Sequence, residues 1–284
     1  MKLSQVTAYL CKGFSFYFMN HVHVETCGND AGPDLVLLHG WAMHSGVWDG
    51  VRERLAQQYR LHLVDLPGHG FSAGLIGESA TLQHMAVAVA QVLPARSMVC
   101  GWSLGGQVAI ELALRQPERV SQLMLVSTTP SFVQREDWQW AMEATVLQQF
   151  AAELQQDVAA MLKRFFALQV RGSSNASTAL AQLRASLLQR GQPDVASLQT
   201  GLQVLLETDL RTQLHKITQP VTLLHGENDV IADPAAAKWM SQVLQNSKLI
   251  MLPRCGHAPF LSHPDKFMEI ISSLSGTKLP HKYD

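Results

Sequence analysis

The sequence predicts an α/β fold, with a mostly parallel central sheet, helices on both faces and an inserted helical segment. Short apolar runs alternate with helix-length segments, which is typical of parallel strands joined by crossover helices. These runs carry Val, Leu, Ile or Met at odd and even positions alike, as in strands covered on both faces. They lie at 34–40, 61–68, 97–103, 121–127, 221–229 and 247–253.

The remaining elements follow from the segments between these runs. The alternating HVHVE at 22–26 predicts an antiparallel edge strand. Helices are expected near 47–58, 79–93, 104–115, 234–245 and 264–274. The predicted organisation is an N-terminal extension at 1–18, a core at 19–130 and 207–275, a helical lid at 131–206, and a flexible tail at 276–284.

The stretch 131–206 has no strand-like run and shows helical periodicity instead. Five apolar residues recur there at spacings of four and three, which predicts one apolar stripe on a helix: Leu154, Val158, Met161, Phe165 and Leu168. Turn-forming sequences interrupt the stretch at 172–177 and 190–194. The segment could supply ordinary core helices or a lid over a site. Its position between two strands of the sheet favours the lid.

Composition argues against several classes of function. The chain has 284 residues, 47% of them hydrophobic, and a formal net charge of −1, which favours neither nucleic acid nor an anionic membrane as a partner. No run reaches the roughly 18 to 20 apolar residues of a membrane helix. Lys12 interrupts the apolar start, which favours a loose extension or an upstream start over an export signal.

The four cysteines, Cys11, Cys27, Cys100 and Cys255, show no CxxC spacing. Two disulfides are possible, but a chain of this length does not need them for stability. We therefore expect reduced thiols and a cytoplasmic location. No metal cluster or nucleotide-binding glycine loop is present in the sequence, so neither a metal nor a cofactor is predicted.

A candidate nucleophile lies in GWSLG at 101–105, which fits the G-x-S-x-G pattern. A strand-like run precedes it and a helix-forming run follows it. Such a sharp strand-to-helix turn strains the backbone of Ser103 and exposes its hydroxyl, and Gly101 and Gly105 allow close backbone approach. A tight turn without chemistry is the alternative, but the strand and helix on either side argue against it.

A serine hydroxyl is a weak nucleophile, so it needs a base, and the base needs an orienting acid. Asp229 ends a predicted strand, and His257 follows the next one. Both would therefore lie at the carboxyl edge of the sheet, where open α/β sheets place their sites. Glu227 and Asp233 are rival acids, but Asp229 has the best position at the strand exit.

An oxyanion hole needs two N–H donors. We predict the backbone N–H of Leu104, at the start of its helix, and that of Trp41, in the loop after the strand at 34–40. His39 is expected to brace this loop. Three other features are expected to take no part in the chemistry. Cys255 is expected to be a packed thiol, His21 and His23 to be solvated, and the turn at 65–70 to have no catalytic role.

Several motifs carry a family resemblance: LVLLHGW at 35–41, LVDLPGHGFS at 63–72, GWSLGGQVA at 101–109, GEND at 226–229 and RCGHAPFLSHP at 254–264. With these, the chain resembles the α/β-hydrolase superfamily from about Met19 to Leu274. Within it, HGWAMHSGVW, GWSLGG, KRFFALQ and DLR resemble the pimeloyl-[acyl-carrier protein] methyl ester esterases of biotin synthesis.

The resemblance implies removal of a methyl group from a pimeloyl chain held on acyl carrier protein. It also implies that Trp41, Leu104 and Phe165 line the substrate channel, and that a basic face of the lid docks the acidic carrier. The candidates for that face are Lys163, Arg164, Arg171, Arg184 and Arg190. Each of them could equally be a solvated helix charge.

Other functions remain open at this point. The same triad would suit a general short-chain carboxylesterase, a carbon–carbon bond hydrolase or a cofactor-free haloperoxidase. A non-catalytic binding protein is the alternative from another class, and the intact triad argues against it. We expect a monomer that binds neither nucleic acid nor membrane.

Overall fold

The computed structural model describes residues 21–77, 80–190 and 193–274. The predicted extension at 1–18 and tail at 276–284 lie outside these residues, as does Cys11. Within the described chain, Cys27, Cys100 and Cys255 are free thiols.

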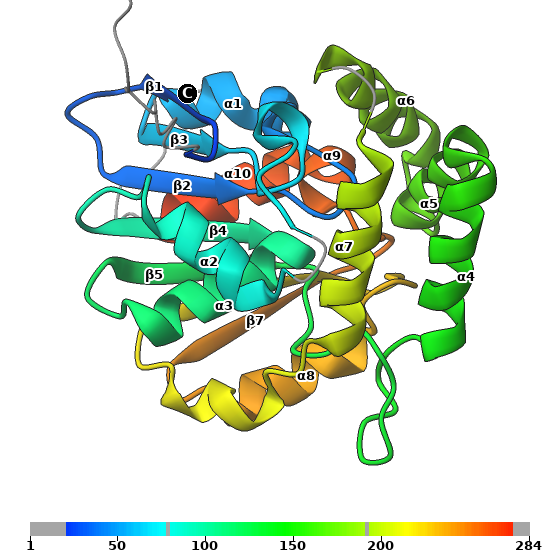
Figure 1. The fold of residues 1–284 in the computed structure, drawn as a ribbon. Helices are drawn as coiled ribbons and strands as arrows, with labels where there is room; N and C mark the ends of the chain where they lie inside the picture. The colour runs from blue at the N-terminus through cyan, green and yellow to red at the C-terminus, as the bar shows by residue number, and fades with distance from the viewer. Residues whose placement is uncertain (1–20, 78–79, 191–192, 275–284) are drawn as a thin grey trace, which may run out of the picture.

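A seven-stranded sheet forms the centre of the molecule, in the order β1-β3-β2-β4-β5-β6-β7 (Figure 1). Only β1 is antiparallel to its neighbour, and every other pair is parallel. The strands are β1 (Val24–Gly28), β2 (Asp34–Leu38), β3 (Arg60–Val64), β4 (Ser97–Trp102), β5 (Val120–Val126), β6 (Val221–Gly226) and β7 (Ser247–Leu252). The predicted fold class and the antiparallel edge strand are confirmed.

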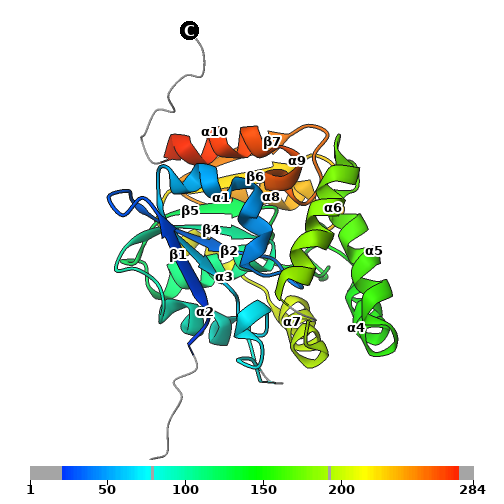
Figure 2. The same cartoon turned by 90° about the horizontal axis from the view of Figure 1, so that it is seen from above.

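Helices cover both faces of the sheet (Figures 1 and 2). One face carries α1 (Asp49–Ala56), α9 (Pro259–Ser262) and α10 (Pro264–Leu274), and the other carries α2 (Leu82–Ala90), α3 (Leu104–Arg115) and α8 (Pro234–Val243). Short 3-10 turns lie at η1 (Ser45–Trp48), η2 (Gly70–Ser72) and η4 (Arg211–Lys216). The local sequence determines where several helices start: Thr81 caps α2 with a capping box, and Asp233 caps α8 ahead of Pro234.

Between β5 and β6 the chain leaves the sheet and forms a helical layer beside it (Figures 1 and 2). This layer contains α4 (Ala144–Gln156), α5 (Val158–Val170), α6 (Ala176–Leu187), η3 (Leu188–Arg190) and α7 (Val195–Glu207). The expectation of one stripe on one helix is wrong. Asp157 ends α4 and caps α5 by accepting the N–H of Ala160, so Leu154 lies on the first helix and the rest of the stripe on the second.

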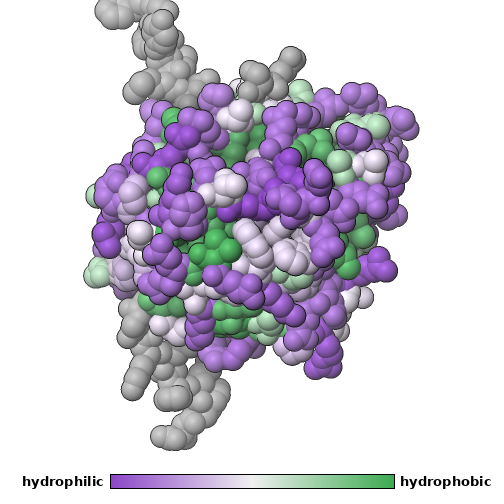
Figure 3. Space-filling view, turned by 90° about the horizontal axis from the view of Figure 1, so that it is seen from below, coloured by the Kyte–Doolittle hydropathy of each residue, from purple (hydrophilic) through white to green (hydrophobic). Residues whose placement is uncertain are grey.

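The apolar side chains form one core cluster that runs through the sheet and into the helical layer. On the surface, Figure 3 shows a face where hydrophilic side chains dominate and interrupt the hydrophobic areas. Among the residues that the structure describes, the exposed large apolar side chains are scattered singly: Phe71, Val87 and Val230. No helix among the described residues is long and apolar enough to cross a membrane.

Candidate active site

Ser103 is the single residue between the end of β4 and the start of α3. Its backbone has φ 56° and ψ −119°, a strained conformation that a non-glycine residue adopts rarely. The turn closes only because Gly105 has no side chain: a Cβ there would lie 2.4 Å from the carbonyl oxygen of Leu38. The local sequence therefore folds into the sharp turn that G-x-S-x-G predicts.

His257 lies in the loop after β7, with its Nε2 2.9 Å from the Oγ of Ser103. Its backbone is held from two sides. Trp102 donates its indole N–H to the carbonyl oxygen of His257 at 2.8 Å, and the N–H of His257 donates to the carbonyl oxygen of Gln169 on α5 at 2.8 Å. Both the sheet and the helical layer therefore fix the ring beside Ser103.

Asp229 follows β6, and its Oδ2 lies 2.8 Å from the Nδ1 of His257. Ser103, His257 and Asp229 thus form a hydrogen-bonded row. The Oδ1 of Asp229 accepts the backbone N–H groups of Ile231 and Ala232. Burial alone would raise the pKa of this carboxyl, but His257, His225 and the backbone N–H of Ile231 outweigh it and hold the pKa below its ordinary value. The carboxylate thus stays charged although its side chain is fully buried.

The two rival acids are placed elsewhere. Glu227 is exposed. Asp233 accepts the N–H of Ala235 and caps α8. Of the three predicted acids, only Asp229 bonds to His257.

This row of groups can move a proton. An ionised Asp229 only accepts, so the Nδ1 of His257 carries the hydrogen of their bond. The Nε2 of the neutral ring then has a free lone pair that accepts the hydroxyl hydrogen of Ser103. That arrangement suits a general base next to a nucleophile.

The loop after β2 packs directly against the turn at Ser103. A Cβ on Gly40 would lie 3.2 Å from the Cβ of Ser103, so the glycine brings the two backbones together. Among the described residues, no acceptor is found for the backbone N–H of Trp41. Leu104 is the first residue of α3, where backbone N–H groups stabilise negative charge. Both predicted donors thus flank Ser103.

His39 lies beneath this loop and is fully buried. Its ring bonds to the carbonyl oxygen of Gly40 at 2.8 Å and accepts the N–H of Leu66 at 2.9 Å. Burial is the main reason that its pKa lies far below the ordinary value, so the ring is neutral at pH 7. It connects the loop after β2 to the loop after β3.

The helical layer closes over the same loop. The rings of Trp41 and Phe165 meet edge to face, with their centroids 4.9 Å apart, and the indole N–H of Trp41 donates to the carbonyl oxygen of Leu198 at 2.9 Å. Leu104, the first residue of α3, is fully buried, and Ser103 is 7% exposed. Of the three residues predicted to line a channel, Trp41 and Phe165 therefore meet where the helical layer contacts the core, and Leu104 follows Ser103 in the core.

Comparison with known proteins agrees with this geometry. The family model of the alpha/beta hydrolase fold matches residues 33–264. The chain belongs to the α/β-hydrolase family. Among its relatives is the pimeloyl-[acyl-carrier protein] methyl ester esterase of Nitrosospira multiformis, 55% identical over 87% of this chain and 95% of that relative. The Nitrosomonas europaea protein of the same name is 54% identical, over 90% of this chain and all of that relative.

Solved α/β hydrolases have the same overall fold. An esterase from Exiguobacterium antarcticum superposes with a TM-score of 0.81 at 25% identity, over 90% of this chain and 96% of the other. An enol-lactonase from Burkholderia xenovorans reaches 0.77 at 19% identity, over 90% and 96%. The predicted family resemblance is confirmed, and the second match supports the fold alone.

The basic residues predicted for this α/β hydrolase's docking face fall into two groups. Lys163, Arg171 and Arg184 are exposed, and so is Arg164, which pairs with Glu153. Arg190 is different: its side chain is 10% exposed and its guanidinium lies 2.5 Å from the buried Oδ2 of Asp65. Including Arg190 in an exposed docking face is therefore wrong, because Arg190 is used to neutralise a core carboxylate.

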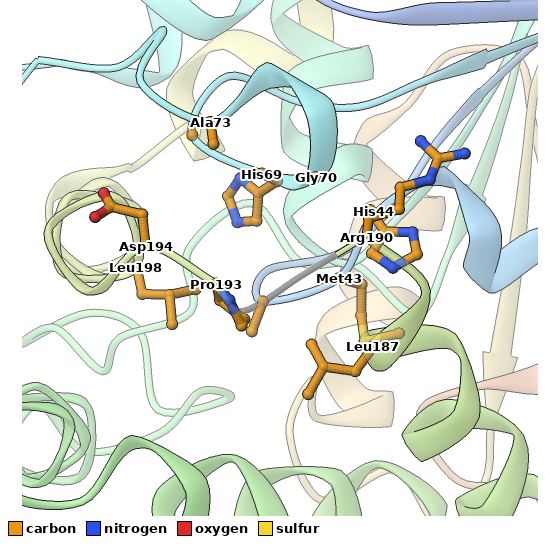
Figure 4. A pocket seen from close by; sticks show the side chains of 12 residues that line it. Met43, His44, His69, Gly70, Ala73, Leu187, Arg190, Pro193, Asp194 and Leu198 are labelled. Carbon is orange, nitrogen blue, oxygen red and sulfur yellow. The ribbon is translucent and has the colours of Figure 1, made fainter.

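Arg190 belongs to a second buried polar cluster, at the seam between the helical layer and the core. Asp65 accepts the backbone N–H groups of Ser45 and Phe71, besides the bond from Arg190. Figure 4 shows His44, His69 and Arg190 around a hollow at this seam, which Ser103 does not line. The Nε2 of His69 is buried and has no hydrogen-bond partner.

The structure adds three residues that the sequence analysis did not single out. Trp102 and Gln169 hold the backbone of His257, and His225 lies beside the carboxylate of Asp229. Trp102 lies within the quoted motif GWSLG and His225 directly precedes the quoted motif GEND, which was the available signal. Gln169 ends the quoted motif KRFFALQ, but its role could not be read from its side chain, because the contact is made by its backbone carbonyl.

No group of three or more His, Cys, Asp or Glu side chains able to hold a metal ion occurs in the described part of the chain.

Proposed function

We propose that this α/β hydrolase is a serine carboxylesterase that removes the methyl group from pimeloyl-[acyl-carrier protein] methyl ester. The hydrogen-bonded row from the Oγ of Ser103 through His257 to Asp229 carries the proposal, because it supplies a nucleophile, its base and an orienting acid. Relatives that are 54–55% identical over nearly their whole length carry the name of this esterase, which supports the substrate.

In the proposed reaction, the Oγ of Ser103 attacks the ester carbonyl carbon while the Nε2 of His257 takes its proton. The backbone N–H groups of Trp41 and Leu104 bind the oxyanion of the tetrahedral intermediate. Asp229 keeps the ring oriented and stabilises the imidazolium. His257 then gives the proton to the departing methoxide, which leaves as methanol and forms an acyl-Ser103 ester.

Water completes the cycle. A water molecule attacks the carbonyl carbon of acyl-Ser103 while His257 takes one of its protons. His257 returns that proton to the Oγ of Ser103 when the bond between the Oγ and the acyl carbon breaks. The product is a free carboxylate on the pimeloyl chain. No step needs a metal or an organic cofactor.

The helical segment at 131–206 is proposed to act as the lid of this site. Phe165 contacts Trp41, and the nearly covered Ser103 lies below them. The acyl chain is proposed to run past these residues and Leu104, toward a carrier protein that docks on Lys163, Arg164, Arg171 and Arg184. A cytoplasmic monomer completes the proposal, and size-exclusion chromatography tests the oligomeric state.

The decisive experiment uses the purified protein with pimeloyl-[acyl-carrier protein] methyl ester and with p-nitrophenyl acetate. We expect the wild type to hydrolyse both, and Ser103→Ala to hydrolyse neither while keeping the same circular dichroism spectrum. Growth without biotin of a bacterium lacking its own pimeloyl-ester esterase should be rescued by the wild type alone. Rapid cleavage of the small ester without rescue would instead favour a general carboxylesterase.

The docking face is tested separately with Lys163→Glu, Arg171→Glu and Arg184→Glu combined. Like-charge repulsion should raise KM for the carrier-bound ester by about tenfold at low salt, and added salt should shrink this difference. Hydrolysis of p-nitrophenyl acetate serves as the control and should stay within about twofold of wild type. An unchanged KM for the carrier-bound ester would remove the docking proposal and leave the esterase proposal in place.

A further inference from the structure

A second histidine lies against the carboxylate of Asp229. His225 is on β6, four residues before Asp229, and is 2% exposed. Its Nε2 is 3.4 Å from the Oδ2 of Asp229, the same oxygen that accepts the hydrogen of His257. It is also 2.8 Å from the carbonyl oxygen of Ala232.

The proton of His225 can be placed from these contacts. The carbonyl oxygen of Ala232 only accepts hydrogen bonds, so the Nε2 must carry the hydrogen. That hydrogen is directed at Ala232, and its partial positive charge also lies near the Oδ2 of Asp229. Burial is the main cause of a lowered pKa for His225, so the ring is neutral at pH 7.

Ala232 is bonded to both residues. Its N–H donates to the Oδ1 of Asp229 at 3.0 Å, while its carbonyl oxygen accepts from His225. These two hydrogen bonds hold the loop from Asp229 to Ala232 against β6, the strand that precedes it. Without the bond from His225, this loop would lose an anchor that keeps two backbone N–H groups on the Oδ1.

We propose that His225 is a positioning residue for the esterase reaction: it fastens the 229–232 loop through Ala232, so that the Asp229 carboxylate stays ionised and aimed at His257. The proposal rests on the proposed serine-esterase function. It assigns His225 no contact with substrate and no proton transfer of its own.

The electrostatic surroundings fit a neutral His225. Asp229, Asp233 and the carbonyl oxygen of Ala232 favour a charged ring, whereas burial and His257 oppose it and prevail. A charged ring 3.4 Å from the Oδ2 would compete with the imidazolium that His257 becomes during the reaction. A neutral donor orients the carboxylate without that competition.

The experiment compares His225→Leu, which removes the donor, with His225→Gln, whose side-chain amide can still donate to Ala232. With p-nitrophenyl acetate, His225→Leu should lower kcat by about ten- to a hundredfold, the range for a lost hydrogen bond in a charged network, with KM within about twofold. His225→Gln should recover most of kcat. Equal losses in both variants, or no loss in His225→Leu, would overturn the proposal.

A double-mutant cycle with Asp229→Asn separates positioning from general structural damage. If His225 acts through Asp229, then adding His225→Leu to Asp229→Asn should lower kcat by less than about twofold more. A loss as large as in the wild-type background would show that His225 acts by another route. An inactive wild type would remove the proposed function itself, and this inference with it.

His62→Leu is the matched control. His62 is also a strand histidine with little exposure, and its Nε2 lies 2.6 Å from the Oδ1 of Asp34. Its removal should lower the melting temperature and leave kcat within about twofold of wild type. A fall in kcat like that of His225→Leu would mean that any lost strand histidine slows the enzyme, and would overturn the specific role of His225.

Discussion

Two buried carboxylates in this protein have similar surroundings and differ in the side chain that hydrogen-bonds to them. Asp65 follows β3 and Asp229 follows β6, and both side chains are fully buried. Each accepts two backbone N–H groups. The side-chain hydrogen-bond partner of Asp65 is the guanidinium of Arg190, whereas that of Asp229 is the ring of His257, with His225 3.4 Å away as a neighbour.

That one partner decides what each carboxylate can do. A guanidinium stays protonated at any physiological pH, so Asp65 is held in a fixed ion pair with no proton to exchange. An imidazole gains and loses a proton near neutral pH, so Asp229 can support a base that cycles during a reaction. Burial, backbone donors and position after a strand do not separate the two. The partner comes from a distant segment in both cases.

The largest expected difference follows from changing each acid to its amide. Asp229→Asn should lower kcat for p-nitrophenyl acetate by about 10⁴-fold, because the amide favours the wrong tautomer of His257. Asp65→Asn should leave kcat of the folded protein within about tenfold of wild type, because Asp65 has no part in proton transfer. Steady-state kinetics on both purified variants measures the contrast.

The control for this comparison is the amount of folded protein, measured by near-ultraviolet circular dichroism. A loss of kcat in folded Asp65→Asn that equals the loss in Asp229→Asn would contradict the division of roles. Rates must be expressed per folded molecule, since Asp65→Asn also leaves Arg190 with only Glu25, 3.5 Å away, as an anionic partner.

The sequence contained enough to predict the sheet and the row of Ser103, His257 and Asp229. Local patterns sufficed there, because strand runs and the glycines around Ser103 act within a few residues. The role of Arg190 could not be predicted, because its partner is 125 positions away and nothing local marks a helical arginine as buried. The break at Asp157 was missed because a capping aspartate leaves the apolar spacing intact.

A smaller effect is expected when the ion pair loses its cation. Arg190→Met keeps a long apolar side chain but leaves Asp65 charged and buried, so the free energy of unfolding should fall by about 3–5 kcal/mol. Urea denaturation at pH 7.5 measures the change. The double variant Asp65→Asn, Arg190→Met removes both charges and should recover part of the loss.

The ion-pair variants also bear on the lid. Arg190 is on η3, which follows α6, and its partner lies in the core, so the pair fastens the helical layer to the sheet. A double variant no more stable than Arg190→Met would show that the buried charge of Asp65 is not what makes the single variant unstable. Arg184→Met, on the exposed part of the same layer, is the matched control and should change stability by less than about 0.5 kcal/mol.

The smallest effect concerns the pH dependence of the seam cluster. Burial lowers the pKa of His69 from its ordinary value of 6.5, so the folded protein stays unprotonated there while the unfolded chain takes up a proton. The free energy of unfolding should therefore fall as pH drops below 6.5, by up to about 1.4 kcal/mol per pH unit for this group. His69→Phe removes the group and should make the fall less steep by that amount.

Urea denaturation of the wild type and of His69→Phe between pH 8 and pH 5 gives the slope of the free energy of unfolding against pH for each protein. At pH 8 the stability of the variant should stay within about 1 kcal/mol of wild type, because the substitution removes a buried Nε2 that has no partner but also the bond from Nδ1 to the carbonyl oxygen of Pro67. Parallel slopes would mean that His69 takes up a proton in the folded protein as readily as in the unfolded chain, and would contradict the prediction. His69→Phe does not alter Asp229 or His257, so kcat at pH 8 should stay within about twofold of wild type. An unchanged kcat together with a changed pH dependence of stability would show that the cluster around Asp65 acts on stability and the cluster around Asp229 on catalysis.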